Sequence, residues 1–157
     1  ATRNPGKIVE YTEFLNIVGV ELVFLDGFDI PDIEENGSTY AENAYIKAKY
    51  FAEKTGMPTI ADDNGFQIHE LDNFPGILSN RWAGKISEKE KIDLLLEKVR
   101  HLKDRTASFV CCICYFDPFS QVSKIFTGIC HGIMTDGPIG QGKMVYYMIE
   151  FSIILFS

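Results

Sequence analysis

The sequence lacks several features that define whole classes of protein. Its 4 cysteines include one Cys-x-x-Cys spacing, Cys111 to Cys114, but no second such pair to complete four ligands, which argues against a zinc site or a disulfide framework. Its 15 basic residues are outnumbered by 22 acidic ones, so a net charge of −7 argues against non-specific binding to nucleic acid. The longest apolar run, Val145 to Phe156, is interrupted by Glu150 and is shorter than the roughly 20 residues that span a bilayer. No cationic segment followed by an apolar stretch opens the chain, which predicts a cytoplasmic protein without a secretory signal.

The composition that remains is typical of one globular domain. Hydrophobic residues make up 46% of the chain and charged residues 24%, which excludes a disordered, collagenous or coiled-coil protein. A length of 157 residues predicts a single domain over residues 1–157 with a core of its own. The cysteines stand in apolar surroundings, so we expect buried, reduced thiols. They are Cys111, Cys112, Cys114 and Cys130.

Three segments have the sequence signs of an α-helix, namely a capping residue followed by a 3.6-residue apolar repeat. They begin after Asn4, Thr39 and Ser87, and the first two are expected to end at Gly19 and Gly56. The second and third also carry a glutamate three residues after the cap, which is the signature of a capping box.

Strand patterns lie between these helices. We expect a short strand at residues 21–25 and a second at residues 58–61, which runs into a turn at 62–65 and continues at 66–68. Residues 106–115 and 123–131 are typical of a β-hairpin. Helices that alternate with strands and end in a hairpin predict an α/β or α+β protein with a central mixed β-sheet flanked by helices.

The first candidate site is the start of the chain. Thr2, Asn4, Gly6 and Lys7 stand at a predicted helix N-terminus, where unpaired N–H groups and the helix dipole favour an anion such as phosphate. The spacing is not that of a P-loop. An ordinary capped helix with a surface lysine is the alternative.

The second candidate site is acidic. Glu34 and Glu35 lie in a loop, and Asp62 and Asp63 follow a strand 28 residues after them. One helix and one strand can bring these two segments together, and carboxylate oxygens are the ligands that Mg²⁺ prefers. A solvated acidic loop and an ordinary turn are the alternatives.

Lys47, on the second predicted helix, could join Lys7 as a second point charge around a polyphosphate, although a solvated lysine on a polar helix face explains it as well. The histidines show no helical pairing and stand near no nucleophile motif, so we expect them to have surface or structural roles. They are His69, His101 and His131.

Taken together, four motifs resemble the inosine triphosphate pyrophosphatase family. They are Ala1-Thr2-x-Asn4-x-Gly6-Lys7, Glu35-x-Gly37-x-Thr39-Tyr40-x-Glu42-Asn43-Ala44-x-x-Lys47-Ala48, Ala61-Asp62-Asp63-x-Gly65 and Pro75-Gly76-Ile77-x-Ser79-x-Arg81. The resemblance implies an elongated α/β fold of two lobes with a cleft, a homodimer, and Mg²⁺-dependent conversion of ITP, dITP or XTP to the monophosphate and pyrophosphate.

The resemblance also assigns roles to residues of this chain. It implies that residues 2–7 bind the triphosphate, that Glu35 and Asp63 are metal ligands, that Asp63 also accepts a proton, and that Lys47 contacts a phosphate. Asn64 stands where the family usually has a substrate-contacting serine. The residues of the triphosphate-binding segment are Thr2, Arg3, Asn4, Pro5, Gly6 and Lys7.

Two departures from the family pattern stand out. Arg3 replaces a glycine of the phosphate loop, and could distort that loop or add a charge to it. After Gly142 the chain lacks the family's base-holding segment, which leaves the base preference undetermined. Codons for residues 144–152, read one base earlier, can encode a sequence close to that segment, which suggests a single-base frameshift near Lys143. The leading prediction is a purine nucleoside triphosphate pyrophosphohydrolase. The alternatives are a catalytically impaired, frameshifted or truncated remnant that keeps the fold, and an α/β interaction module without activity.

Overall fold

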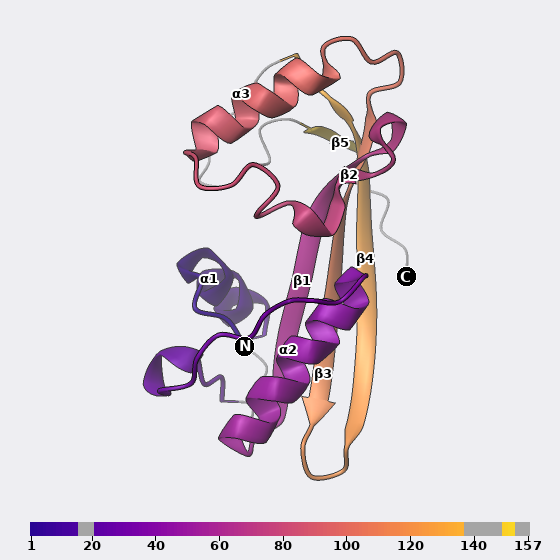
Figure 1. The fold of residues 1–157 in the computed structure, drawn as a ribbon. Helices are drawn as coiled ribbons and strands as arrows, with labels where there is room; N and C mark the ends of the chain where they lie inside the picture. The colour runs from indigo at the N-terminus through magenta and orange to yellow at the C-terminus, as the bar shows by residue number, and fades with distance from the viewer. Residues whose placement is uncertain (16–20, 137–148, 153–157) are drawn as a thin grey trace. The chain divides into compact units, whose positions relative to one another are not determined.

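The computed structural model describes residues 1–15, 21–136 and 149–152 (Figure 1). Within these ranges, three α-helices and five strands follow one another, with short 3₁₀ turns between them. The helices are α1 (Pro5–Phe14), α2 (Tyr40–Thr55) and α3 (Glu88–Val99). The strands are β1 (Thr59–Ile68), β2 (Phe74–Pro75), β3 (Thr106–Asp117), β4 (Val122–Met134) and β5 (Ile149–Ser152). The 3₁₀ turns are η1 (Leu25–Gly27), η2 (His69–Leu71) and η3 (Gly76–Leu78).

The strands form one sheet in the order β2-β1-β3-β4-β5. The pairs β1–β2 and β4–β5 are antiparallel, with Gln67 opposite Pro75 and His131 opposite Ser152. The predicted α/β class with a central sheet flanked by helices is thereby confirmed. None of the helices in the described ranges is long and apolar enough to cross a membrane.

The chain divides into two compact units. The first consists of Ala1–Asp63 and Cys112–Phe126, and the second of Asn64–Cys111 and Thr127–Ser157. The strands β1, β3 and β4 each contribute to both units, and each unit has its own buried side chains.

In the first unit, α2 begins and ends as the sequence predicts. The Thr39 hydroxyl accepts from the Glu42 N–H at 3.1 Å, and Gly56 ends the helix in the left-handed region at φ 67°. The Glu42 carboxylate accepts from the Ser38 N–H and hydroxyl at 2.7 and 2.6 Å, which lowers the pKa of Glu42. The face of α2 toward the core consists mainly of small, fully buried alanines and one aromatic ring. These residues are Ala44, Ala48, Phe51 and Ala52.

In the second unit, α3 starts with the predicted capping box. The Ser87 hydroxyl accepts from the Glu90 N–H, and the Glu90 carboxylate accepts from the Ser87 N–H at 2.8 Å. The apolar face of the helix packs into a core that contains residues from β1, β3 and β4 as well. The buried members of this core are Ile68, Leu95, Val99, Ala107 and Met134.

Helix α1 is capped as predicted, because the Asn4 side chain accepts from the Gly6 N–H at 2.9 Å and Pro5 occupies the first helical position. The helix runs to Phe14. The predicted stop at Gly19 lies outside the described residues.

The strand predicted at residues 21–25 is wrong. Residues 21–24 belong to no helix or strand, and Leu25–Gly27 form η1, closed by the Phe28 N–H, which donates to the Leu25 carbonyl at 3.0 Å. A strand needs a neighbour to bond its backbone groups, and the sheet contains no strand from this segment. A turn bonds its own backbone groups and needs no partner strand.

The turn predicted at residues 62–65 is also wrong. Strand β1 runs without a break from Thr59 to Ile68, so Asp62 and Asp63 stand within a strand. The Asp-Asp-Asn-Gly sequence favours a turn when its side chains are solvated. Here both carboxylates are 5% exposed and have partners on other segments, which makes the extended backbone compatible with burial.

The hairpin prediction is confirmed, and its two strands are longer than expected. The turn between β3 and β4 is held by the Asp117 carboxylate, which accepts from the Phe119 N–H at 2.9 Å and from the Ser120 hydroxyl at 2.7 Å. None of the four cysteines forms a disulfide, as predicted. Cys112 and Cys114 are buried, and burial raises the pKa of Cys114, whereas the prediction of burial is wrong for Cys111 and Cys130, which are partly exposed on the two hairpin strands.

Candidate active site

The loop that precedes α1 forms a small network of its own. The Thr2 hydroxyl accepts from the Asn4 N–H at 3.1 Å, and the Asn4 side chain accepts from the Gly6 N–H at 2.9 Å. The nitrogen of Ala1 donates to the Ile60 carbonyl, so this loop lies beside β1. The predicted capped helix N-terminus is confirmed, and its use as a phosphate site stays a prediction.

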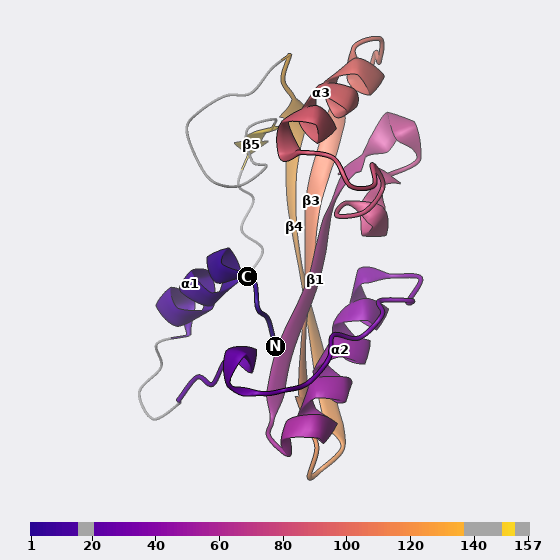
Figure 2. The same cartoon turned by 60° about the vertical axis from the view of Figure 1, so that its left-hand side comes forward.

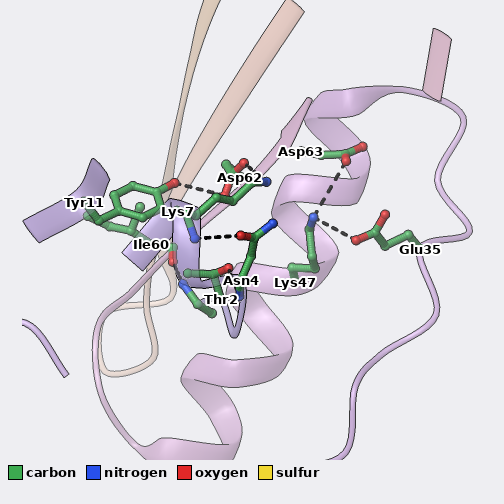
Figure 3. Close-up of polar contacts among 11 residues, drawn as sticks. Thr2, Asn4, Lys7, Tyr11, Glu35, Lys47, Ile60, Asp62 and Asp63 are labelled. Atoms are coloured by element: carbon green, nitrogen blue, oxygen red, sulfur yellow. Dashed lines mark hydrogen bonds and ion pairs between the residues drawn. The ribbon is translucent and has the colours of Figure 1, made fainter. Parts of the chain in front are cut away.

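Asp62 of β1 faces residues of α1. The Lys7 ammonium lies 2.5 Å from Asp62 Oδ2, and the Tyr11 hydroxyl donates to Asp62 Oδ1 at 3.0 Å (Figure 3). Burial by itself raises the pKa of Asp62, but Lys7, Lys47 and the Tyr11 hydroxyl together outweigh it, so the pKa lies below its ordinary value. Asp62 is therefore an ionised carboxylate that holds the Lys7 ammonium at the end of its side chain.

Asp63 faces residues of α2. The Lys47 ammonium lies 2.8 Å from Glu35 Oε1 and 3.7 Å from Asp63 Oδ1. Figure 3 shows the lysine reaching both carboxylates. Glu35 comes from the loop before α2 and Asp63 from β1, so two segments 28 residues apart converge on one cation. This convergence was predicted for Glu35 and Asp63, whereas Glu34 is exposed to solvent.

The two groups are related by the geometry of a strand. Successive side chains of a strand point to opposite faces of the sheet, so the nearest cation of Asp62 comes from α1 and that of Asp63 from α2. Helices α1 and α2 lie on opposite sides of β1 in Figure 2, and each aspartate reaches a lysine on one of them. Two neighbouring positions of one strand therefore hold the predicted site residues: Lys7 pairs with Asp62, and Lys47 lies beside Asp63.

Asn43 was missed as a functional residue by the sequence reasoning, which used it only as part of a motif. Its side chain is fully buried, donates to Asp63 Oδ2 at 3.0 Å and accepts from the Gly37 N–H at 2.8 Å. The available signal was its spacing, since Asn43 and Lys47 are four residues apart and occupy one face of α2.

Arg3 faces the acidic loop. Its guanidinium pairs with the Asp32 carboxylate and donates to the Ile30 carbonyl at 2.5 Å. The arginine that replaces a family glycine thus joins residues 1–4 to the segment that leads to Glu35. Asn64 is the next residue of β1 after Asp63 and belongs to the second unit.

The donor set of the first unit fits a hard divalent cation. Glu35 and Asp63 already converge on a positive charge, and Mg²⁺ is commonly held by one or two carboxylates together with substrate phosphates and water. Within the described ranges there is no cluster of three or more histidine, cysteine, aspartate or glutamate side chains that could enclose a metal ion. The site therefore suits a cation shared with a ligand better than a closed structural metal site.

Comparison with known proteins places these features in a family. A family model described as the Ham1 family matches residues 1–151. A Thermus thermophilus protein named dITP/XTP pyrophosphatase is 37% identical over 148 residues, which cover 93% of this chain and 71% of the relative. A protein of the same name from Dictyoglomus thermophilum is 41% identical over 150 residues, or 93% of this chain and 73% of the relative.

Solved structures agree. The structure of a HAM1 protein from Coxiella burnetii matches with a TM-score of 0.88 at 36% identity and covers 95% of this chain and 78% of that one. A nucleoside-triphosphatase, dITP/XTP pyrophosphatase, from Mycobacterium abscessus matches with a TM-score of 0.81 at 33% identity, over 96% of this chain and 80% of that one. With sequence, fold and motif order in agreement, this chain belongs to the Ham1 family.

Proposed function

We propose that this protein hydrolyses non-standard purine nucleoside triphosphates to the monophosphate and pyrophosphate. The observation that carries the proposal is the convergence of the Glu35 and Asp63 carboxylates on the Lys47 ammonium, in a chain whose relatives are named dITP/XTP pyrophosphatases. A triphosphate and its cation need this combination of carboxylates and lysines, because a protein of net charge −7 otherwise repels a polyanion.

We assign Mg²⁺ as the cofactor, with Glu35 and Asp63 as its protein ligands. When bound, the ion would neutralise phosphate charge and stabilise the pyrophosphate leaving group. Asp63 is in addition our candidate acceptor for the proton of the attacking water, because a carboxylate at the metal can orient or deprotonate that water. The lysines at positions 7 and 47 supply positive charge on either side of β1.

The nucleotide is expected to lie against the loop before α1. Thr2, Asn4 and the N-terminal turn of α1 provide hydroxyl, amide and backbone groups suited to phosphate oxygens. Arg3, Pro5 and Gly6 belong to the same segment, and Asn64 is proposed to contact the substrate from β1. Purine substrates such as ITP, dITP and XTP are inferred from the family and its named members.

A direct assay tests this function. The protein is incubated with dITP, XTP, ITP and ATP with and without Mg²⁺, and the products are resolved by ³¹P NMR. We expect monophosphate and pyrophosphate from the non-standard purines, and no turnover with a chelator. Release of inorganic phosphate alone, or no reaction with Mg²⁺ present, contradicts the proposal. Absence of any reaction with Mg²⁺ present would favour the alternative of a catalytically impaired chain that keeps the fold, an alternative that none of the comparisons supports.

A matched pair of variants assigns the activity to this site. Glu35→Gln removes the carboxylate that pairs with Lys47, and Glu34→Gln removes an exposed carboxylate one residue earlier. The first variant is expected to lose Mg²⁺-supported turnover and the second to keep it. Equal activity of both variants would show that the loop carboxylate is not a ligand.

Three wider inferences accompany the proposal. We infer a homodimer, which analytical ultracentrifugation tests, and a cytoplasmic enzyme that binds neither nucleic acid nor membranes. We also infer that residues 1–157 act as one catalytic domain. The frameshift near Lys143 concerns residues mostly outside the described ranges and stays a prediction, which the gene sequence tests.

A further inference from the structure

We infer that Asn43 is the positioning residue that fixes the spacing and orientation of the two proposed metal-binding carboxylates. This inference rests on the proposed function, because Glu35 and Asp63 are the ligands in question. Asn43 contacts neither the metal nor the substrate in this scheme. It acts through the segments that carry those carboxylates.

The Asn43 amide joins three segments of the first unit. Its Oδ1 accepts from the Gly37 N–H at 2.8 Å, and Gly37 lies two residues after Glu35. Its Nδ2 donates to Asp63 Oδ2 at 3.0 Å. The side chain is 0% exposed, and it extends from the helix that carries Lys47 one turn later. One buried amide therefore ties the Glu35 loop and the Asp63 strand to the helix of the lysine between them.

The chemistry of this position requires an asparagine. An amide side chain can donate and accept at the same time, whereas an ionised aspartate only accepts and leucine does neither. The contact with Asp63 also selects an orientation, because it holds Oδ2 and leaves Oδ1 toward Lys47 at 3.7 Å. Asn43 thus fixes the orientation of the Asp63 carboxylate toward the cation.

Gly37 gives independent support. A Cβ atom at this residue would lie 2.7 Å from Asn43 Oδ1 and 2.8 Å from the Cβ of Glu42. Such distances are too short for a side chain, so the loop approaches α2 as closely as its backbone permits. Any larger residue at position 37 must displace the loop that carries Glu35, even with Asn43 intact.

Two variants separate positioning from simple loss of stability. Asn43→Leu keeps the approximate shape and removes both hydrogen bonds, and Gly37→Ala displaces the same loop without removing the amide. Ala52→Gly is the matched control, because Ala52 is also fully buried on α2 but lies nine residues after Asn43. The change should lower stability without changing the site. The thermal unfolding of these three variants is measured first, and the binding measurements are made at a temperature at which all of them are folded.

The primary readout is Mn²⁺ binding to the nucleotide-free protein, measured by electron paramagnetic resonance. Loss of a side chain that orients metal ligands typically weakens metal affinity 10- to 100-fold. We therefore expect Asn43→Leu and Gly37→Ala to raise the Mn²⁺ dissociation constant at least about tenfold, and Ala52→Gly to leave it unchanged. The Mg²⁺ concentration for half-maximal dITP hydrolysis should rise in parallel, with a smaller change in the KM for the nucleotide.

The outcomes distinguish this inference from the proposed function. Wild-type Mn²⁺ affinity in both folded variants, or equal losses in the Ala52→Gly control, would overturn the role of Asn43 whether or not the enzyme turns over dITP. Mn²⁺ binding by the native protein that is no tighter than binding by Glu35→Gln would overturn it as well. If Mn²⁺ affinity falls as expected but no nucleotide is hydrolysed, Asn43 keeps its role and the proposed reaction is wrong.

Discussion

Each of the two compact units holds polar side chains along its strands, and the two sets are built differently. In the first unit, Asp62 and Asp63 are buried carboxylates that meet the ammonium groups of Lys7 and Lys47. In the second, the buried Ser108 hydroxyl lies between two histidines, 2.7 Å from His69 Nε2 and 2.9 Å from His131 Nδ1.

The first set consists of ion pairs whose members can exchange partners, whereas the second is a chain of hydrogen bonds. Burying a charge is costly unless it is paired, and a lysine can leave its carboxylate when a metal ion and a phosphate replace both partners. The row of His69, Ser108 and His131 is a chain of hydrogen bonds, continued from His69 Nδ1 to the Thr106 hydroxyl at 3.0 Å. A set of paired charges is thus suited to ligand exchange, and a hydrogen-bonded row is suited to joining strands.

The largest expected effect comes from removing a charge in the first unit. Asp63→Asn keeps the shape of the side chain but removes the anionic oxygens that face Lys47 and the proposed metal. We expect kcat to fall by about a hundredfold or more, as for the loss of a general base or ligand. Steady-state pyrophosphate release measures it, with Asp117→Asn in the exposed hairpin turn as the control. Turnover close to that of the native protein would remove Asp63 from the mechanism.

A lysine substitution tests whether the charges are exchangeable. Lys47→Met removes the ammonium that lies between Glu35 and Asp63. Triphosphate affinity should fall about tenfold, and monophosphate affinity much less, because the lysine acts on the outer phosphates. Metal affinity of the nucleotide-free protein should rise, since a competing cation is gone.

Calorimetric titration with a non-hydrolysable dITP analogue, with dIMP and with Mn²⁺ measures these three affinities. Lys49→Met is the control, because Lys49 lies on the same helix and pairs with the exposed Glu53 at 3.9 Å. A fall in metal affinity in Lys47→Met would mean that the lysine supports the carboxylates instead of competing for them.

A smaller effect is expected in the second unit. Ser108→Ala breaks the hydrogen-bonded row at its centre and should lower the free energy of unfolding by about 1 kcal/mol, the usual net value of a hydrogen bond. Activity should stay within about twofold of the native protein. Urea unfolding and the pyrophosphate assay measure the two quantities, with Ser123→Ala on the exposed part of β4 as the control. A large loss of activity without a loss of stability would show that the hydrogen-bonded row of the second unit takes part in the reaction.

The smallest effect is a pH dependence of the α3 cap. Hydrogen bonds from the Ser87 hydroxyl and N–H lower the pKa of Glu90 from 4.5, so its capping contribution is present above that value and is lost as the pH falls through the folded-state pKa. At pH 6 the native protein should melt at a slightly higher temperature than Glu90→Gln, and the difference should shrink below pH 4.5. A difference that is constant from pH 6 to pH 3 would show that the ionised cap does not contribute.

The sequence by itself determined the local structure of this protein. Asn4, Thr39 and Ser87 cap three helices at the predicted positions, and Gly56 ends the second. The hairpin of β3 and β4 was equally predictable. Each of these features depends on residues that are close together in the sequence, so one helical turn or one loop is enough to predict it.

The tertiary structure decided which segments become strands and how the site is held. Residues 21–24 have strand-like side chains but find no partner in the sheet, and residues 62–65 have turn-like side chains but lie within β1. The spacing along the chain predicted that the segments of Glu35 and Asp63 meet, yet it gave no hint that Asn43 joins them. The physical reason is that burying Asp62 and Asp63 in a strand is favourable only when ammonium, hydroxyl and amide groups of α1 and α2 pair with their carboxylates. These partners lie far from the two aspartates in the sequence, so no local pattern of residues predicts the pairing.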